Sequence, residues 1–125
     1  MGELAGMIEK VVWSLPAPSQ EFMQGPQILI SPGKVTLRWD SESETGAYEW
    51  SSAEFTGVEA VRFTADSSCT PDQARAYDRL VKVEPSLLLS DLRGAGPKFL
   101  QHFRIYFDEV GCLDVVAEEF LPPKA

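Results

Sequence analysis

The chain has 125 residues, and 19 Asp and Glu against 11 Lys and Arg give it a formal net charge of −8 at pH 7. Its apolar fraction of 44% excludes a disordered chain, and one core suffices at this length, so we expect a single domain over residues 1–125. The charge argues against binding to nucleic acid or to an anionic membrane, since phosphate contacts need positive side chains, and it favours a basic protein partner.

The first predicted element is an N-terminal helix over residues 3–13. Apolar side chains recur there at helical spacing, and Pro16 and Pro18 follow where the helix should end. The apolar positions are Leu4, Met7, Ile8, Val11 and Val12.

The next part of the chain has the alternating pattern of β strands. In residues 34–39, Val35, Leu37 and Trp39 alternate with polar side chains, which is the period of a half-buried strand. Further strands are expected over residues 27–30, 48–52 and 58–65.

A central helix is predicted over residues 70–84. Thr70, Pro71 and Gln73 supply an N-cap, a proline in the first turn and a capping box. An apolar stripe then continues along the helix, and Pro85 ends it. The stripe consists of Ala74, Tyr77, Leu80 and Val81, and Ser86 is expected to cap a second, short helix that ends at Gly94.

The last element is a β-hairpin over residues 99–118. Pairing Asp108 with Cys112 leaves residues 109–111 as the loop, with Gly111 in the left-handed conformation. Phe103, Ile105 and Phe107 then share an apolar face with Leu113, Val115 and Ala117, while His102, Arg104 and Tyr106 lie opposite Glu118, Val116 and Asp114 on a solvated face. We therefore predict an α+β fold, in which a mostly antiparallel sheet carries the N-terminal and central helices on one face.

Six of the acidic residues fall between Arg38 and Arg62, with no basic residue among them. Four aromatic residues share this segment, so it is either a solvated strand face with core aromatics or an acidic surface with aromatic anchors for a basic protein. The polar face of the hairpin is a second candidate recognition surface. The predicted binding residues are Trp39, Asp40, Glu42, Glu44, Tyr48, Glu49, Trp50, Glu54, Arg104 and Tyr106.

Catalytic chemistry is limited by a single histidine, His102. Cys69 precedes the Thr70 cap, where a helix dipole lowers a thiol pKa, so Cys69 and His102 are the candidate catalytic pair. Cys112 is too far along the hairpin to act with His102. The alternative is that Cys69 is a structural thiol and that His102 contacts Glu118 across the hairpin. The cysteine spacing predicts no metal site, and no motif predicts a cofactor.

A cytoplasmic location is expected. Glu3 and Glu9 interrupt the apolar residues near the start, which argues against a secretory signal, and no apolar run approaches the roughly 20 residues that span a bilayer.

The sequence thus favours a small acidic protein-binding module without catalytic activity, which neutralises or regulates a basic partner in the manner of an immunity protein. One alternative is a small enzyme that uses Cys69, His102 and a carboxylate. Another is a ligand-binding domain with a pocket lined by Trp39, Trp50 and Tyr77. An exposed strand edge would also allow a homodimer.

Overall fold

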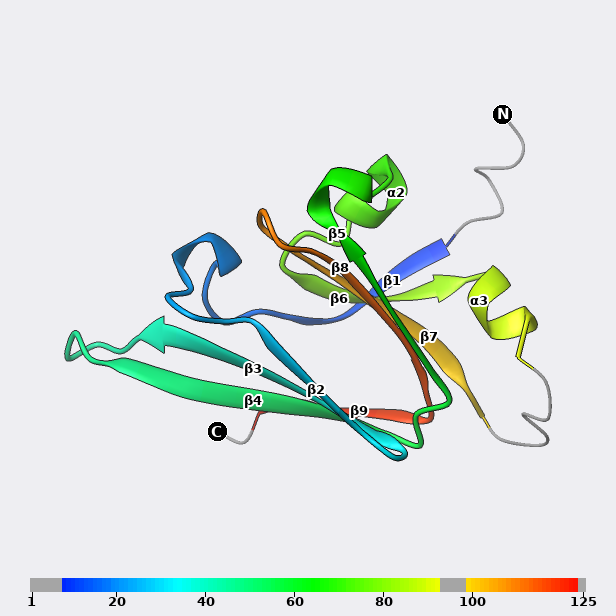
Figure 1. Cartoon of the computed structure of the whole chain (residues 1–125), viewed down its shortest axis with the longest axis horizontal. Coiled ribbons are helices and arrows are strands. Elements are labelled where there is room, and N and C mark those ends of the chain that lie inside the picture. The colour runs from blue at the N-terminus through cyan, green and yellow to red at the C-terminus, as the bar shows by residue number, and fades with distance from the viewer. Residues whose placement is uncertain (1–7, 93–98, 124–125) are drawn as a thin grey trace.

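The computed structural model describes residues 8–92 and 99–123, which fold into two antiparallel β-sheets packed face to face (Figure 1). The five-stranded sheet has the order β1 (Ile8–Ser14), β6 (Arg79–Glu84), β7 (Gln101–Phe107), β8 (Gly111–Ala117) and β5 (Ala60–Ala65). The four-stranded sheet has the order β2 (Gln27–Ser31), β3 (Lys34–Glu42), β4 (Tyr48–Thr56) and β9 (Glu119–Leu121).

The predicted α+β class is wrong, because helices are limited to short turns in the described parts of the chain. These turns are η1 (Ser19–Glu21), η2 (Asp66–Ser68), α2 (Pro71–Ala74) and α3 (Leu87–Ser90). The alternating apolar patterns predicted strands correctly, whereas the helical patterns did not predict helices of the expected length. The strands predicted over residues 27–30, 34–39, 48–52 and 58–65 correspond to β2, β3, β4 and β5.

The N-terminal helix is wrong where the structure describes it, because residues 8–14 form the edge strand β1. Residues 3–7 lie outside the described residues. The strand pairs antiparallel with β6, and its register shifts between Val11 and Trp13. The bulge breaks the two-residue alternation of the strand at Val11 and Val12, so this part of the sequence does not show a strand period. Trp13 packs against Trp39 and Phe120.

The central helix is correct only at its start. The predicted capping box is present, with the Gln73 N–H donating to Thr70 Oγ1 at 3.2 Å and the Thr70 N–H donating to Gln73 Oε1 at 2.8 Å. Helix α2 nevertheless ends at Ala74. Asp78 takes a left-handed φ of +56°, and β6 follows directly. Leu80 and Val81 then pack in separate apolar clusters, as neighbouring residues on a strand do.

Helix α3 begins as predicted, because Ser86 Oγ accepts the Leu89 N–H at 2.9 Å. Its first turn ends at Ser90. The prediction that this helix continues to Gly94 is wrong, because Asp91 caps it and Leu92 is not helical. Gly94 itself lies outside the described residues.

The C-terminal hairpin has the predicted faces but the wrong register. Phe103 pairs with Val115 and Phe107 pairs with Gly111, two residues away from the predicted pairing. A shift of two keeps every side chain on its face, which is why burial alone does not distinguish the two registers. In the observed register Gly111 is the first residue of β8 and packs closely on β5, since a Cβ at this position would lie 2.2 Å from the Thr64 carbonyl oxygen.

The main core lies between the two sheets. Figure 1 shows the four-stranded sheet as one layer and the five-stranded sheet as the other. The buried side chains come from β3, β4, β6, β7 and β8, and they include Leu37, Trp39, Phe55, Phe103, Ile105, Phe107 and Leu113. A second, smaller cluster consists of Ala76 from the turn after α2 and residues of β6, β7 and β8, namely Val81, Val83, Tyr106 and Cys112.

A buried carboxylate attaches the segment before β2 to β3. Asp40 is 3% exposed, and its oxygens accept the backbone N–H groups of Met23, Gln24 and Gly25 at 2.8 to 3.1 Å. Burial by itself raises the pKa of Asp40, but these backbone hydrogen bonds outweigh it and hold the pKa below its ordinary value. Asp40 therefore acts as a structural residue.

We predict that Asp40→Asn lowers the free energy of unfolding by about 2 kcal/mol or more, because an amide offers fewer acceptor sites and points N–H groups at other donors. Urea unfolding at pH 7 measures this. The control is Glu42→Gln on the same strand, whose exposed side chain should change stability by less than about 0.5 kcal/mol. Equal unfolding midpoints for the two variants would contradict the role of Asp40.

We also predict that Gly111→Ala destabilises the protein by at least about 3 kcal/mol, since the new Cβ would overlap β5. Gly33→Ala separates this clash from the cost of backbone conformation. Gly33 has a φ of +73° but no other atom within 4 Å of a built Cβ, so its substitution should cost only about 1 kcal/mol. Thermal unfolding of both variants checks the difference, and similar losses would exclude the proposed contact with Thr64.

Candidate functional site

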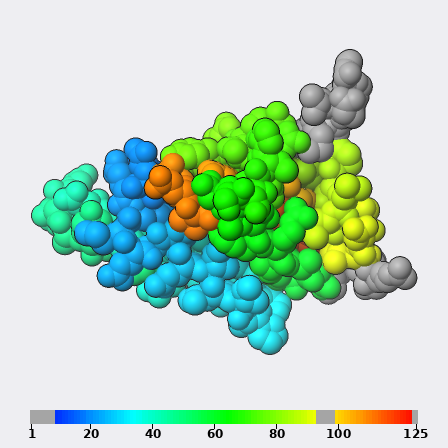
Figure 2. Space-filling view, turned by 45° about the horizontal axis from the view of Figure 1, so that its top comes forward, coloured from blue at the N-terminus to red at the C-terminus, as the bar shows by residue number. Residues whose placement is uncertain are grey.

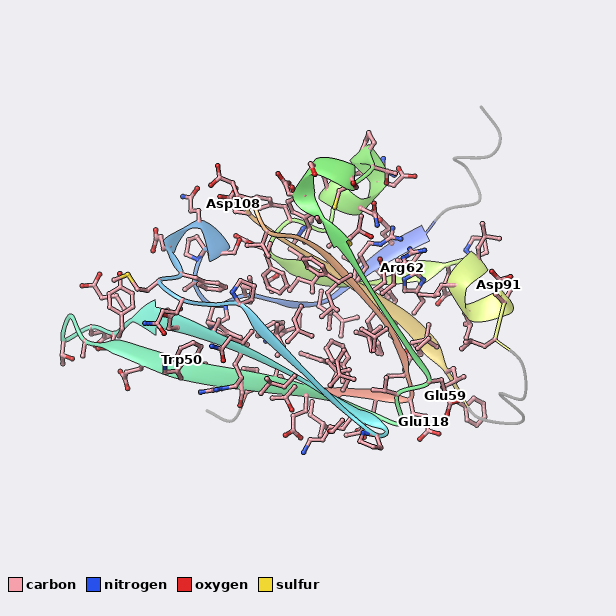
Figure 3. All side chains as sticks on the ribbon, viewed as in Figure 1. Trp50, Glu59, Arg62, Asp91, Asp108 and Glu118 are labelled. Carbon is pink, nitrogen blue, oxygen red and sulfur yellow. The ribbon has the colours of Figure 1, made fainter. Side chains whose placement is uncertain are left out.

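The first candidate site is the end of the β3–β4 hairpin, which extends beyond the body of the protein (Figures 1 and 2). Glu42 pairs with Tyr48 and Asp40 with Trp50, so the two aromatic side chains lie on one face of β4. Tyr48 is 45% exposed and Trp50 is 40% exposed. Figure 3 shows Trp50 on the sheet opposite to the one that carries Arg62.

Three exposed carboxylates lie at the same end of the hairpin. Glu42 is the neighbour of Tyr48 on β3, Glu44 is in the turn, and Glu49 is on the opposite face of β4 from the two rings. We call this surface the acidic–aromatic tip, and it consists of Glu42, Glu44, Tyr48, Glu49 and Trp50. The guanidinium of Arg38 lies 4.6 Å from the centre of the Trp50 ring and also donates to the Gln27 side chain at 3.2 Å. These contacts fix the Trp50 side chain on the surface of the sheet.

The other five predicted binding residues are not part of the tip surface, although Asp40 is the direct neighbour of Trp50 on β3. Trp39 is fully buried in the core, and Asp40 holds the backbone before β2. Glu54 pairs with Lys34 at 3.1 Å. Arg104 and Tyr106 are buried in the five-stranded sheet. The structure therefore brings half of the predicted residues together and distributes the rest among structural roles.

An open groove of about 510 Å³ runs beside the tip. Strand β9 pairs only with Glu54–Thr56 of β4, so the earlier part of this edge has no strand partner in the part of the chain that the structure describes. The groove follows this edge. Its lining includes Trp50, Ser52, Glu54, Leu121, Pro122 and Pro123.

The second candidate site is a row of buried polar groups on the other face of the five-stranded sheet. Asp114 is 0% exposed, and its Oδ1 atom lies 2.5 Å from His102 Nε2 and accepts a hydrogen bond from Arg104 Nε at 2.8 Å. Arg62 donates to Oδ2 at 3.3 Å. Arg62 and Arg104 are the direct neighbours of Asp114 on β5 and β7. The hairpin face that we expected to be solvated is thus buried and ion-paired.

Asp114 remains ionised in this environment. Burial by itself raises its pKa, but the hydrogen bond from His102 and the charge and hydrogen bond of Arg104 outweigh burial and bring the pKa to about 2. The carboxylate therefore acts only as an acceptor at neutral pH.

His102 does not make the expected contact with Glu118. Its Nε2 faces Asp114, and its Nδ1 lies 2.6 Å from the hydroxyl oxygen of Ser86. Sequence reasoning identified Ser86 only as a helix cap and missed this contact, which connects the start of α3 to β7. No local pattern signals it, because the contact depends on how β6 and β7 separate.

Ser86 and His102 both line a pocket of about 250 Å³. Strands β6 and β7 pair only at Val81 with Arg104 and at Lys82 with Phe103, and the pocket lies where they diverge. The rest of its lining consists of Lys82, Val83, Glu84, Pro85, Leu89, Leu100 and Gln101.

The predicted pair of Cys69 and His102 is not formed. The Cys69 thiol donates to the carbonyl oxygens of Thr64 and Ala65 at 3.4 and 3.5 Å. Burial raises the pKa of Cys69, and burial followed by the charge of Asp114 raises that of Cys112. Neither thiol is activated as a nucleophile, which is the opposite of the expected effect at Cys69.

The predicted ligand pocket is also not formed. Trp39 is in the core, and Trp50 lies on the outer face of β4. Tyr77 instead donates its hydroxyl to Asp108 at 2.8 Å, and this hydrogen bond, with burial, raises the pKa of Tyr77 to about 12.

Comparisons with known proteins give no match to a family model, to a curated protein or to a solved structure. Within residues 8–92 and 99–123, no three His, Cys, Asp or Glu side chains gather in a way that would hold a metal ion. None of the described helices has the length and apolar character needed to cross a membrane. Function is therefore argued from the two sites themselves.

We predict that the contribution of Asp114 to stability is complete above about pH 5 and is lost as the pH falls from about 4 to 2. The folded state holds the Asp114 pKa at about 2, below the unfolded value of about 3.9, so acid protonates the unfolded chain first. Asp114→Asn should lose about 3 to 5 kcal/mol at pH 7, because the Arg104 charge stays buried without this partner.

Urea unfolding from pH 7 to pH 2 tests this. Asp114→Asn should show a smaller loss of stability over the acid range than the unsubstituted protein. The exposed Asp91→Asn serves as the matched control and should keep the original pH dependence. The assignment fails if Asp114→Asn loses stability with acid as steeply as the control.

Proposed function

We propose that the protein binds a basic protein partner through the acidic–aromatic tip and thereby neutralises or regulates that partner. The single observation that carries this proposal is the position of Tyr48 and Trp50. Both rings are 40% exposed or more, on a hairpin that extends beyond the core and carries three exposed carboxylates.

The aromatic rings would supply most of the binding energy. Tyrosine and tryptophan bury a large area with few rotatable bonds, and for this reason they dominate the energetics of interfaces. The Trp50 ring is held against Arg38 on a paired strand, so little side-chain freedom remains to be lost on binding.

The carboxylates would select the partner. Glu42, Glu44 and Glu49 place negative charge on the tip, and the whole chain, with these three residues included, has a net charge of −8. Such a field accelerates association with a positively charged surface and disfavours acidic proteins. A partner whose basic site is covered by the tip would be blocked there, which is how a small acidic inhibitor neutralises a basic protein.

We predict that Trp50→Ala weakens binding to this partner by about 30-fold, the loss expected for an interface hot spot. Partners are captured from native lysate by crosslinking, identified by mass spectrometry, purified and titrated with each variant. The triple variant Glu42→Gln, Glu44→Gln and Glu49→Gln should reduce the association rate and its dependence on salt.

The matched control removes the same charge elsewhere, by Glu21→Gln, Glu84→Gln and Asp91→Asn at exposed positions. It should bind nearly as well as the unsubstituted protein. The proposal is wrong if no basic protein depends on the tip, or if the control weakens binding as much as the tip variants do.

A further inference from the structure

We propose that Ser86, His102 and Asp114 are the nucleophile, general base and orienting carboxylate of an acyl-transfer site that hydrolyses a short, uncharged ester in the pocket between β6, β7 and α3. This activity is separate from partner binding, since His102 and Asp114 lie on the five-stranded sheet, Ser86 follows its strand β6, and the tip lies on the other sheet. It also departs from the expectation of a noncatalytic protein.

The hydrogen-bond directions follow from Asp114. An ionised carboxylate only accepts, so the Nε2 atom of His102, 2.5 Å away, is the one that carries the proton. In a neutral imidazole the other nitrogen then presents a lone pair. That nitrogen, Nδ1, lies 2.6 Å from Ser86 Oγ, and in the neutral form that the proposed role requires it accepts the serine hydroxyl proton. A hydroxyl that donates to a base held by a carboxylate is the arrangement of an activated nucleophile.

The imidazole is turned relative to the usual serine hydrolase, because here Nδ1 faces the serine and Nε2 faces the carboxylate. Either ring nitrogen accepts a proton when the other is protonated, so the roles are preserved. Arg104 also donates to Asp114 and fixes the carboxylate that orients the ring.

The serine is accessible to a substrate. Ser86 is only half-buried and lines the pocket together with His102. One lone pair of Oγ accepts the Leu89 N–H at 2.9 Å, which leaves the second lone pair for attack. A helix cap needs only an acceptor oxygen, so capping explains neither the imidazole on the same hydroxyl nor the pocket that opens onto both groups.

The pocket favours a small acyl group. Its volume of about 250 Å³ is below the range of about 300 to 1,000 Å³ that is usual for larger ligands. Val83, Pro85, Leu89 and Leu100 give it apolar walls, which suits a short aliphatic chain.

The reaction balances without an oxidant or a metal. Ser86 Oγ bonds to the acyl carbon as its proton moves to His102 Nδ1, and the bond from that carbon to the alcohol oxygen then breaks while the alcohol takes the proton. Water next attacks the acyl carbon on Ser86 and gives a proton to Nδ1. The bond to Oγ breaks, Ser86 recovers this proton, and the carboxylic acid leaves.

The test treats the full chain with a small fluorophosphonate and follows its intact mass. We expect one adduct, which peptide mass spectrometry places on Ser86. His102→Gln should slow labelling by at least about 100-fold, the contribution of a general base. Hydrolysis of p-nitrophenyl butyrate should show the same dependence on both residues.

Ser86→Asn keeps the variant folded, because asparagine caps helices as well as serine does, and it should abolish the adduct at an unchanged unfolding midpoint. The control is Ser90→Ala on the same helix, where the exposed hydroxyl donates to the Leu87 carbonyl, and labelling should persist. The proposal is overturned if the protein is not labelled, if the adduct is on another residue, or if His102→Gln is labelled at the original rate.

Discussion

The five-stranded sheet carries one fully buried negative charge, Asp114, and the outer face of that sheet is organised around neutralising it. Arg104 and Arg62 are its direct neighbours on the two adjacent strands, and His102 completes its contacts. An isolated buried carboxylate would cost several kcal/mol, so this charge restricts the register of three strands at once. A slip of one residue on β8 would turn Asp114 toward the apolar core, where the neighbouring side chains are aromatic and aliphatic.

The two sheets therefore have different roles. The outer face of the five-stranded sheet carries a series of buried polar contacts. In one direction they extend from Asp114 through His102 to Ser86. In the other direction they extend through Arg104, whose Nη1 atom lies 4.0 Å from Glu9 Oε2. The four-stranded sheet uses its inner face for the core, and its β3–β4 hairpin continues past that core. Exposed rings can therefore be presented on the hairpin without weakening the packing between the sheets.

Many elements of the fold can be predicted from short-range sequence patterns. The predictions are wrong where contacts between residues far apart in the sequence determine the length or register of an element. The Thr70 capping box was predicted correctly because it involves neighbouring residues, but α2 ends after one turn because Leu80 and Val81 pack in different apolar clusters. The hairpin faces were predicted from alternation. Its register was not, because the two registers differ by two residues and therefore bury the same side chains.

The candidate sites show the same limit. A run of acidic residues predicts a negative surface, but each carboxylate stays available only if nothing nearby satisfies it. Asp40 meets three backbone N–H groups and Glu54 meets Lys34, so these two charges serve the fold. The remaining acidic residues of the hairpin lie where β3 and β4 extend beyond the core, so their carboxylates face solvent. The contact of Ser86 with His102 has no such local signal, because it arises only where two paired strands separate.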